Sequence, residues 1–297
     1  MHVSPPQHYN QQQRQQQQQQ QPQQYPQPQL QQQQQHDVAG LAPRLPKCLI
    51  IGAAKAGTDA LLEFLTLHPD IVVRHGDLNF FDVDKKYKRG LEYYRTLLPP
   101  SLPDQILIEK SPGYILSEKV PPRVREMNSS MKMLLIVRDP VRRTLSLYAH
   151  FIKGGTRLPP VAALLFDKQG NVNPNARYDL IEGSTYHLGL LMWLQYFPRD
   201  QIHIVDGEHY RKDPYAELYK VETFLGVGHK ISKQNIYYDQ GRGFYCMIKG
   251  NETECLPPSK GLTHPNLTDT ELEKLKNYFQ PLNRKFFEVA NQSFDWN

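Results

Sequence analysis

The sequence predicts an α/β protein with an open, mostly parallel sheet flanked by helices, and three observations carry this prediction. Short apolar runs alternate with segments of helical periodicity through residues 45–297, as in a sheet covered on both faces. The run at 132–137 is almost wholly apolar, which is typical of a central parallel strand. The stretch 48–71 reads as a strand, a tight turn and a helix, the usual frame of a phosphate-binding loop.

The elements follow in order from the same patterns. The first strand ends at a glycine and is followed by a helix that covers about 57–68. Further strands are expected at 71–74, 105–111, 132–137 and 202–210. Further helices are expected at 85–99, 120–128, 141–153, within 178–198 and at 213–226. After the last loop, Thr268 as N-cap and Glu271 as its capping-box partner begin a predicted pair of terminal helices.

The N-terminal segment differs from the rest of the chain in composition. The first 35 residues contain 20 glutamines and few apolar side chains. Such a segment cannot bury enough surface to offset the entropy of ordering it. We therefore predict a disordered Gln/Pro-rich tail over 1–44 and one folded domain over 45–297. A glutamine-rich interaction tail, as in transcriptional regulators, is the alternative.

The charge and hydropathy patterns exclude some classes of protein. The net charge of +5 is mild and suits an acidic partner. A dense basic stripe with interleaved aromatic residues, the mark of many nucleic-acid binders, is not present, so no nucleic acid is expected as a partner. No window reaches 18 consecutive apolar residues, and the N-terminus has no apolar core of a signal peptide.

The cysteines and glycosylation motifs point to a secretory compartment. Cys48 lies in the first strand and is expected to be a buried thiol, while Cys246 and Cys255 flank a polar loop. Spacing alone leaves open whether these two form a disulfide. The lack of a signal peptide argues against secretion. A truncated gene start, with a membrane anchor outside this chain, would reconcile that lack with the secretory features. The four Asn-x-Ser/Thr motifs begin at Asn128, Asn251, Asn266 and Asn291.

The loop from Gly52 to Thr58 is the first candidate for binding an anion. Its backbone N–H groups and the start of the next helix attract negative charge, and Lys55 and Thr58 add a cation and a hydroxyl. A tight turn of small packing residues is the alternative. In the common P-loop the lysine follows the second glycine, but here Lys55 precedes Gly57. This order disfavours an ATP-using protein, and no later strand end offers carboxylates for Mg²⁺.

A second anion subsite is indicated by "LLIVRDPVRRTLSLY". Arg138 follows the buried strand, and Ser146 lies two turns into the next helix. An arginine at a strand end can bind a phosphate with two hydrogen bonds. Alternatively, Arg138 pairs with Asp139 and Ser146 is a surface hydroxyl. Together, the two motifs fit a nucleotide with phosphates at both ends.

These residues, taken together, resemble the heparan sulfate glucosamine 3-O-sulfotransferases of the Golgi sulfotransferase superfamily. The resemblance covers the whole folded part and rests on the segments "IIGAAKAGT", "LHPDI", "FFD", "IEKSPGY", "LLIVRDPVRRTLSLY", "YHLGLLMWLQYFP", "IHIVDGE", "KVETFLG" and "SKGLTHP". It implies a P-loop-like sulfotransferase fold, a location in the Golgi lumen and no metal. It also implies transfer of a sulfuryl group from 3′-phosphoadenosine 5′-phosphosulfate (PAPS) to the 3-hydroxyl of glucosamine in heparan sulfate or a related acidic glycan.

The resemblance also assigns expected roles to residues. Lys55 assists the leaving group, Asp77 is the base, and Cys246 and Cys255 form the family disulfide. The residues implied to hold the donor are Lys55, Ala56, Gly57, Thr58, Arg138, Ser146, Tyr245, Lys260 and Gly261. The residues implied to support the base or bind the acceptor are Asn79, Asp82, Lys110 and His150.

Four positions depart from the family pattern, and all lie on the acceptor and base side. Asp77 replaces a glutamate and is one methylene shorter. Asn79 replaces a histidine, Ala54 an arginine and His150 a glutamine. Two interpretations stay open: a divergent enzyme, or a PAPS- and glycan-binding protein with weak or no activity. A sulfotransferase for a different glycan is a third.

Overall fold

The computed structural model describes residues 40–257 and 263–296. Most of the predicted tail and the predicted donor residues Lys260 and Gly261 lie outside these ranges. The first described element is the short strand β1 (Ala42–Pro43), which pairs with β4 (Pro100–Ser101). Within the described ranges, no helix is long and apolar enough to cross a membrane.

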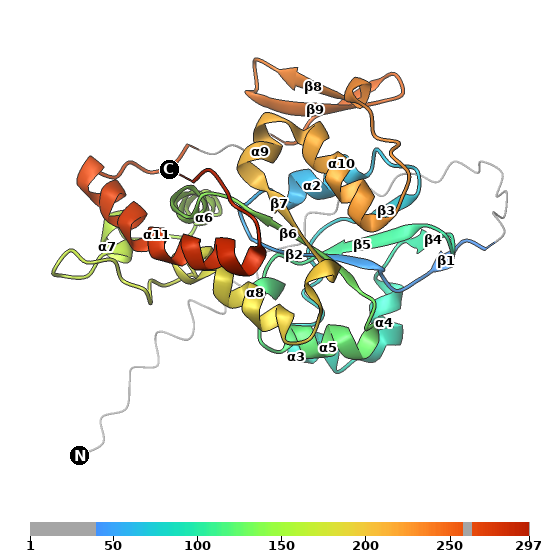
Figure 1. Ribbon diagram of the computed structural model, residues 1–297, viewed down its shortest axis with the longest axis horizontal. Helices are drawn as coiled ribbons and strands as arrows, with labels where there is room; N and C mark the ends of the chain where they lie inside the picture. Colours follow the sequence, from blue (N-terminus) through green and yellow to red (C-terminus); the bar gives the residue numbers. More distant parts are fainter. Residues whose placement is uncertain (1–39, 258–262, 297) are drawn as a thin grey trace, which may run out of the picture. The chain divides into compact units, whose positions relative to one another are not determined.

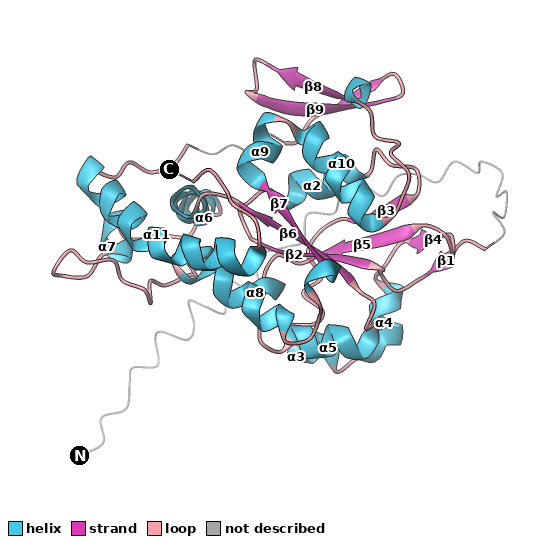
Figure 2. Cartoon of the chain, viewed as in Figure 1, coloured by secondary structure: helices cyan, strands magenta, loops and turns pink. Residues whose placement is uncertain are grey.

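The centre of the fold is a parallel five-stranded sheet in the order β3-β5-β2-β6-β7 (Figure 2). This confirms the predicted sheet, except that the strand expected at 202–210 ends at Asp206, where the Asp206 side chain caps the helix that begins at Gly207. All four neighbouring pairs are parallel, so the carboxyl ends of the strands share one edge, where ligands of such sheets bind. The strand bounds are β2 (Cys48–Gly52), β3 (Ile71–Arg74), β5 (Ile106–Lys110), β6 (Lys132–Val137) and β7 (Ile202–Asp206).

Helices cover both faces of this sheet (Figure 1). One face carries α2 (Thr58–Leu65), α9 (Gly207–Lys212) and α10 (Pro214–Leu225). The opposite face carries α4 (Gly90–Thr96), α5 (Val120–Met127) and α8 (Tyr186–Leu194). The remaining α-helices are α3 (Asp84–Tyr87), α6 (Pro140–Lys153), α7 (Val161–Leu165) and α11 (Asp269–Ala290). Single 3-10 turns are η1 (Tyr114–Leu116), η2 (Glu182–Ser184), η3 (Arg199–Gln201) and η4 (Lys233–Asn235).

The core explains why the central strands are nearly continuous apolar runs. Every residue of β2 is buried, and so are five of the six residues of β6. The sheet is therefore screened from water on both faces. A second apolar cluster joins α6, α7 and α11, with Leu145, Leu165, Leu275 and Phe279 among its members. This cluster anchors α6, the helix that begins just after Arg138.

Two helix predictions are wrong. The helix expected at 85–99 is broken at Gly90, whose φ of +80° separates α3 from α4. The expected terminal helix pair is the single helix α11, which continues through Pro281. Buried Leu275, Phe279, Phe286 and Ala290 lie on both sides of this proline. Packing of that face outweighs the hydrogen bond that a proline removes from a helix.

A small antiparallel sheet contains the predicted disulfide. Its strands are β8 (Ile236–Asp239), β9 (Phe244–Lys249) and β10 (Glu252–Glu254). Cys246 on β9 is bonded to Cys255, just after β10, which confirms the pairing that the family resemblance implies. Cys48 is a free, buried thiol, as expected.

Candidate active site

The loop between β2 and α2 presents backbone N–H groups at the edge of the sheet. Ala53 N–H donates to the Ile136 carbonyl on β6 at 2.7 Å, which ties the loop to the next strand. Gly57, the N-cap of α2, has a φ of +120°, and a Cβ there would lie 3.2 Å from Ile136 Cδ1. Lys55 also has a positive φ, of 71°. The loop therefore turns sharply into a helix start that favours an anion.

Arg138 joins this loop, so the two predicted anion motifs meet. Its Nη1 donates to the Lys55 carbonyl at 3.3 Å, and its Nε lies 3.4 Å from Glu208 Oε1. Asp139, the alternative partner, instead caps α6 by accepting from the backbone N–H of Arg142 at 2.7 Å. Ser146 is half-buried two turns along α6.

The surroundings of Arg138 are positively charged. Arg142 lies 3.2 Å from Glu208 and so shares that carboxylate with Arg138. Burial lowers the pKa of His264, and the nearby Arg138 and Arg142 lower it further. Arg211 also lies 4.0 Å from Glu208, so the arginines near this point outnumber the carboxylates of Glu208 and Asp139.

Arg143 is a buried cation that binds the backbone of the loop between β2 and α2. The residue is 1% exposed, and its Nε donates to the Ala54 carbonyl at 3.1 Å. Its Nη1 donates to the Asp179 carbonyl at 2.6 Å, and its guanidinium lies against Gly183, where a Cβ would collide with it. Arg143 thus connects the predicted donor-binding loop at 52–58, called the donor loop below, to the segment 179–184. The sequence alone does not indicate this role.

Replacing Arg143 by methionine is expected to lower the free energy of unfolding by about 3 kcal/mol, because buried carbonyls lose their donors. Urea unfolding measures this. Arg142→Met is the matched control: its side chain is 52% exposed, and we expect a change of at most about 0.5 kcal/mol. Equal unfolding midpoints for the two variants would contradict the role of Arg143.

On the acceptor side, Lys110 lies between two carboxylates. Its side chain is 4% exposed, so Lys110 is a buried lysine. Lys110 Nζ lies 2.7 Å from Asp59 Oδ1 and also contacts Asp77 Oδ1. Asp59 is in the first turn of α2, directly after the donor loop. These contacts place Asp77, the predicted base, near the N-terminus of α2.

Two hydroxyl groups accept hydrogen bonds from the backbone of the loop that carries Asp77. Asn79 has a φ of 48°, which asparagine tolerates better than most residues, and its N–H donates to Ser111 Oγ at 2.9 Å. Phe80 N–H donates to the hydroxyl of Tyr114 at 2.9 Å. At the end of the loop, burial raises the pKa of Asp82, whose Oδ1 has no hydrogen-bond partner among the described residues.

Glu109 is a buried acid beneath this loop. It is completely buried, and its Oε1 accepts from Ser111 Oγ at 2.5 Å, while Oε2 has no partner among the described residues. Burial raises the pKa of Glu109 from 4.5 to about 7; the nearby Asp77 raises it as well, and the hydrogen bond from Ser111 opposes the rise.

A pH-dependent stability follows from Glu109. The folded-state pKa of about 7 exceeds the ordinary 4.5, so protonation of Glu109 stabilises the folded protein. This contribution to the free energy of unfolding is complete below pH 4.5 and is lost as the pH rises through 7. Glu109→Gln keeps an acceptor for Ser111 and removes the titration. Between pH 5 and 8, the free energy of unfolding should decrease in both proteins or only in the wild type. We expect the decrease in the wild type to exceed that in the variant by on the order of 2–3 kcal/mol. Urea unfolding at both pH values measures this, and the exposed Glu92→Gln is the control. Parallel pH profiles for wild type and Glu109→Gln would contradict the prediction.

Two other predicted site residues are not part of these contacts. His150 is exposed on the last turn of α6. Tyr245 is on β9, and its hydroxyl donates to the Lys212 carbonyl at the end of α9, at 2.8 Å. Lys260 and Gly261 lie outside the described residues.

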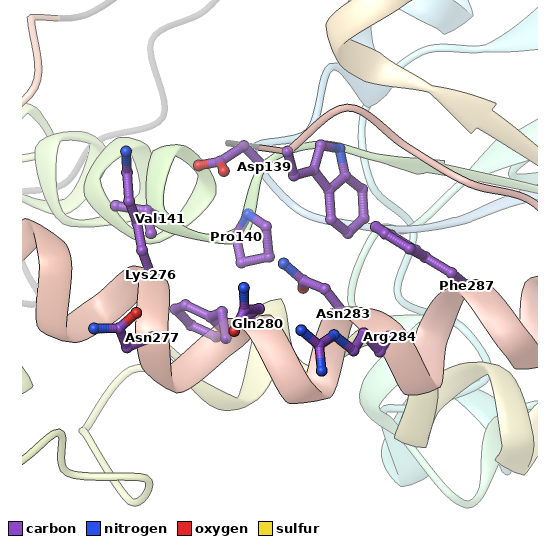
Figure 3. Close-up of a pocket in the computed structure, with 11 residues that line it drawn as sticks. Asp139, Pro140, Val141, Lys276, Asn277, Gln280, Asn283, Arg284 and Phe287 are labelled. Atoms are coloured by element: carbon purple, nitrogen blue, oxygen red, sulfur yellow. The ribbon is translucent and has the colours of Figure 1, made fainter.

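A cavity of about 350 Å³ lies beside the start of α6 (Figure 3). Side chains of α11, including Lys276, Gln280 and Asn283, form one wall, and Pro140 lies opposite them. Among the described residues, none of the predicted site residues lines this cavity. The candidate site is therefore the sheet edge that contains Lys55, Asp77 and Arg138, not this cavity.

Comparisons with known proteins identify the family of the chain. The sulfotransferase domain family model matches residues 45–295. The chain is 41% identical over 262 residues to heparan sulfate glucosamine 3-O-sulfotransferase 5 of Mus musculus, covering 86% of this chain and 75% of that protein. It is 36% identical over 256 residues to heparan sulfate glucosamine 3-O-sulfotransferase 6 of Homo sapiens, covering 85% and 74%. A sulfotransferase structure from Alicyclobacillus acidocaldarius has the same fold, with a TM-score of 0.63, 19% identity, and coverage of 84% and 98%.

Proposed function

Because the chain belongs to the heparan sulfate glucosamine 3-O-sulfotransferase family, we propose that it transfers a sulfuryl group from PAPS to the 3-hydroxyl of a glucosamine in heparan sulfate. The observation that carries the proposal is the contact of Lys110 with both Asp59 and Asp77. It sets a carboxylate beside the N-terminus of the helix that follows the donor loop. An acceptor hydroxyl there would have an anion-binding loop on one side and a base on the other.

The proposed reaction needs one proton acceptor and one charge stabiliser. The acceptor oxygen attacks the donor sulfur in line, and Asp77 takes the hydroxyl proton. The bond between sulfur and the bridging phosphate oxygen breaks, and that oxygen leaves with the electron pair. Lys55 stabilises the charge that grows on it. Arg138 and Ser146 would hold the 3′-phosphate of the donor. The backbone N–H groups from Ala56 to Thr58 would hold its 5′-phosphosulfate.

A second candidate function is that of a protein that binds PAPS and a glycan but transfers poorly. The observation that favours it is the contact of the Asp77 carboxylate with Lys110, because the Asp77 side chain is one methylene shorter than the family glutamate. A misplacement of about 1 Å can cost on the order of 10²-fold in rate. The intact donor side, with Arg138 against the carbonyl of Lys55, is common to both candidates.

The Golgi lumen is the proposed location. The Cys246–Cys255 disulfide requires an oxidising compartment. The motif asparagines Asn251, Asn266 and Asn291 are exposed, as glycosylation requires.

Radiolabelled PAPS and a panel of acidic glycans test the function. We expect label on N-sulfated heparan sulfate and thermal stabilisation by PAP, the desulfated nucleotide. Stabilisation by PAP without a labelled product would favour the binding protein, and label on another glycan would change the acceptor. Stabilisation by ATP–Mg²⁺ and not by PAP would contradict the sulfotransferase proposal altogether.

A further inference from the structure

Asp59 is an acidic residue in a place where an anion is expected to bind. It follows the donor loop directly, and its carboxylate shares Lys110 with Asp77. We propose, building on the proposed function, that Asp59 is a positioning residue that keeps Asp77 basic by taking part of the charge of Lys110. The same residue would weaken donor binding.

Asp59 and Asp77 both contact the ammonium group of Lys110 directly. Lys110 Nζ lies 2.7 Å from Asp59 Oδ1 and contacts Asp77 Oδ1, and the lysine side chain is almost fully buried. Both carboxylates are 42% exposed, so each is also accessible to solvent. The buried ammonium group therefore has two competing anionic partners, each on a different element.

Sharing one cation changes the basicity of its partners. A carboxylate beside an unshared ammonium holds its negative charge more firmly and accepts a proton less readily. Burial lowers the pKa of Lys110, but Asp59 and then Asp77 outweigh it, so the net shift is upward. Both carboxylates therefore stabilise the charged form of Lys110. Removing Asp59 would leave Asp77 as the main partner of Lys110.

Two other charged residues lie close to this cluster along the chain. Glu109 precedes Lys110 on β5, and the nearby Asp77 contributes to the raised pKa of Glu109. Lys55 belongs to the donor loop, four residues before Asp59. A donor with a phosphosulfate and a phosphate would meet the negative charge of Asp59 at the end of α2 that otherwise attracts anions.

Asp59→Asn separates catalysis from donor binding. We expect kcat to fall about 10-fold, because Asp77 becomes a weaker base. We expect the Kd for PAP to fall about threefold, because a like charge leaves the anion site. The acid limb of the rate profile should move to lower pH. Asp59→Glu, which keeps the charge, should restore most of kcat.

Glu63→Gln is the matched control. It removes one acid from the next turn of α2, where the carboxylate lies 3.0 Å from His75 rather than near Lys110. We expect its kcat and its Kd for PAP to equal those of the wild type.

Two further readouts keep this test separate from the proposed function. The Asp77 carboxyl carbon, followed by NMR, should titrate at lower pH in Asp59→Asn even if no glycan is sulfated. An unchanged titration would overturn the proposal. So would a joint loss of kcat, PAP affinity and thermal stability, which indicates a structural role. If the wild type labels no glycan but Asp59→Asn shifts the titration and tightens PAP binding, the proposed function fails and the role of Asp59 stands.

Discussion

Replacing Lys55 by alanine is expected to lower kcat by about 10³-fold, because the charge on the leaving oxygen then lacks its positioned cation. Lys55 follows β2 in a loop that is tied to β6 by the Ala53 N–H bond, so its backbone position should survive the change. PAP should still bind, through the loop N–H groups and Arg138, with an affinity about 10-fold lower. Single-turnover transfer from labelled PAPS measures the rate.

The control for Lys55 is a lysine at the opposite end of the same strand. Lys47 precedes β2, and its Nζ donates to the carbonyls of Pro103 and Gln105. Lys47→Ala should therefore leave kcat and PAP binding unchanged. A Lys55→Ala rate within about 10-fold of the wild type would remove this residue from the chemistry.

Replacing Asp77 by asparagine is expected to lower kcat by about 10³-fold, since the acceptor hydroxyl loses its base. PAP affinity should change little, because Lys110 keeps Asp59 as a partner at 2.7 Å. Asp77→Glu restores the family residue at this position, and we expect it to retain or raise the wild-type rate. Steady-state kinetics with N-sulfated heparan sulfate measure all three proteins.

The control for Asp77 lies at the other end of its strand. Asp70 precedes β3 and pairs with Lys230 at 2.6 Å, away from the carboxyl edge of the sheet. Asp70→Asn should keep the wild-type kcat. If Asp77→Asn keeps more than about a tenth of the activity, another group takes the proton.

The parallel sheet could be predicted because its signals are local. The apolar runs of β2 and β6 have no polar interruptions, as strands buried on both faces require. Helix ends were readable where capping is local: Thr268 and Glu271 form a capping box, and Gly226 ends α10 in the left-handed conformation. The course of α11 through Pro281 could not be read, because it depends on packing with distant residues.

In the candidate site, too, local motifs could be predicted from the sequence, whereas contacts between distant residues could not. Lys55, Arg138 and Asp77 could be named from motifs and family resemblance. The contact of Arg138 with the carbonyl of Lys55 could only be expected from their shared sheet edge. Asp59 and Arg143 act through partners on other elements, and no sequence pattern identifies these pairs. An acidic residue directly after a candidate anion-binding loop is the sequence feature by which Asp59 could have been singled out.

The most direct test of the central claim is the position of the sulfate on the product. The wild-type protein is incubated with labelled PAPS and N-sulfated heparan sulfate, and the product is digested to disaccharides. The proposed function predicts label on the 3-oxygen of glucosamine. Label at any other oxygen, or no label from a protein that binds PAP, would contradict it.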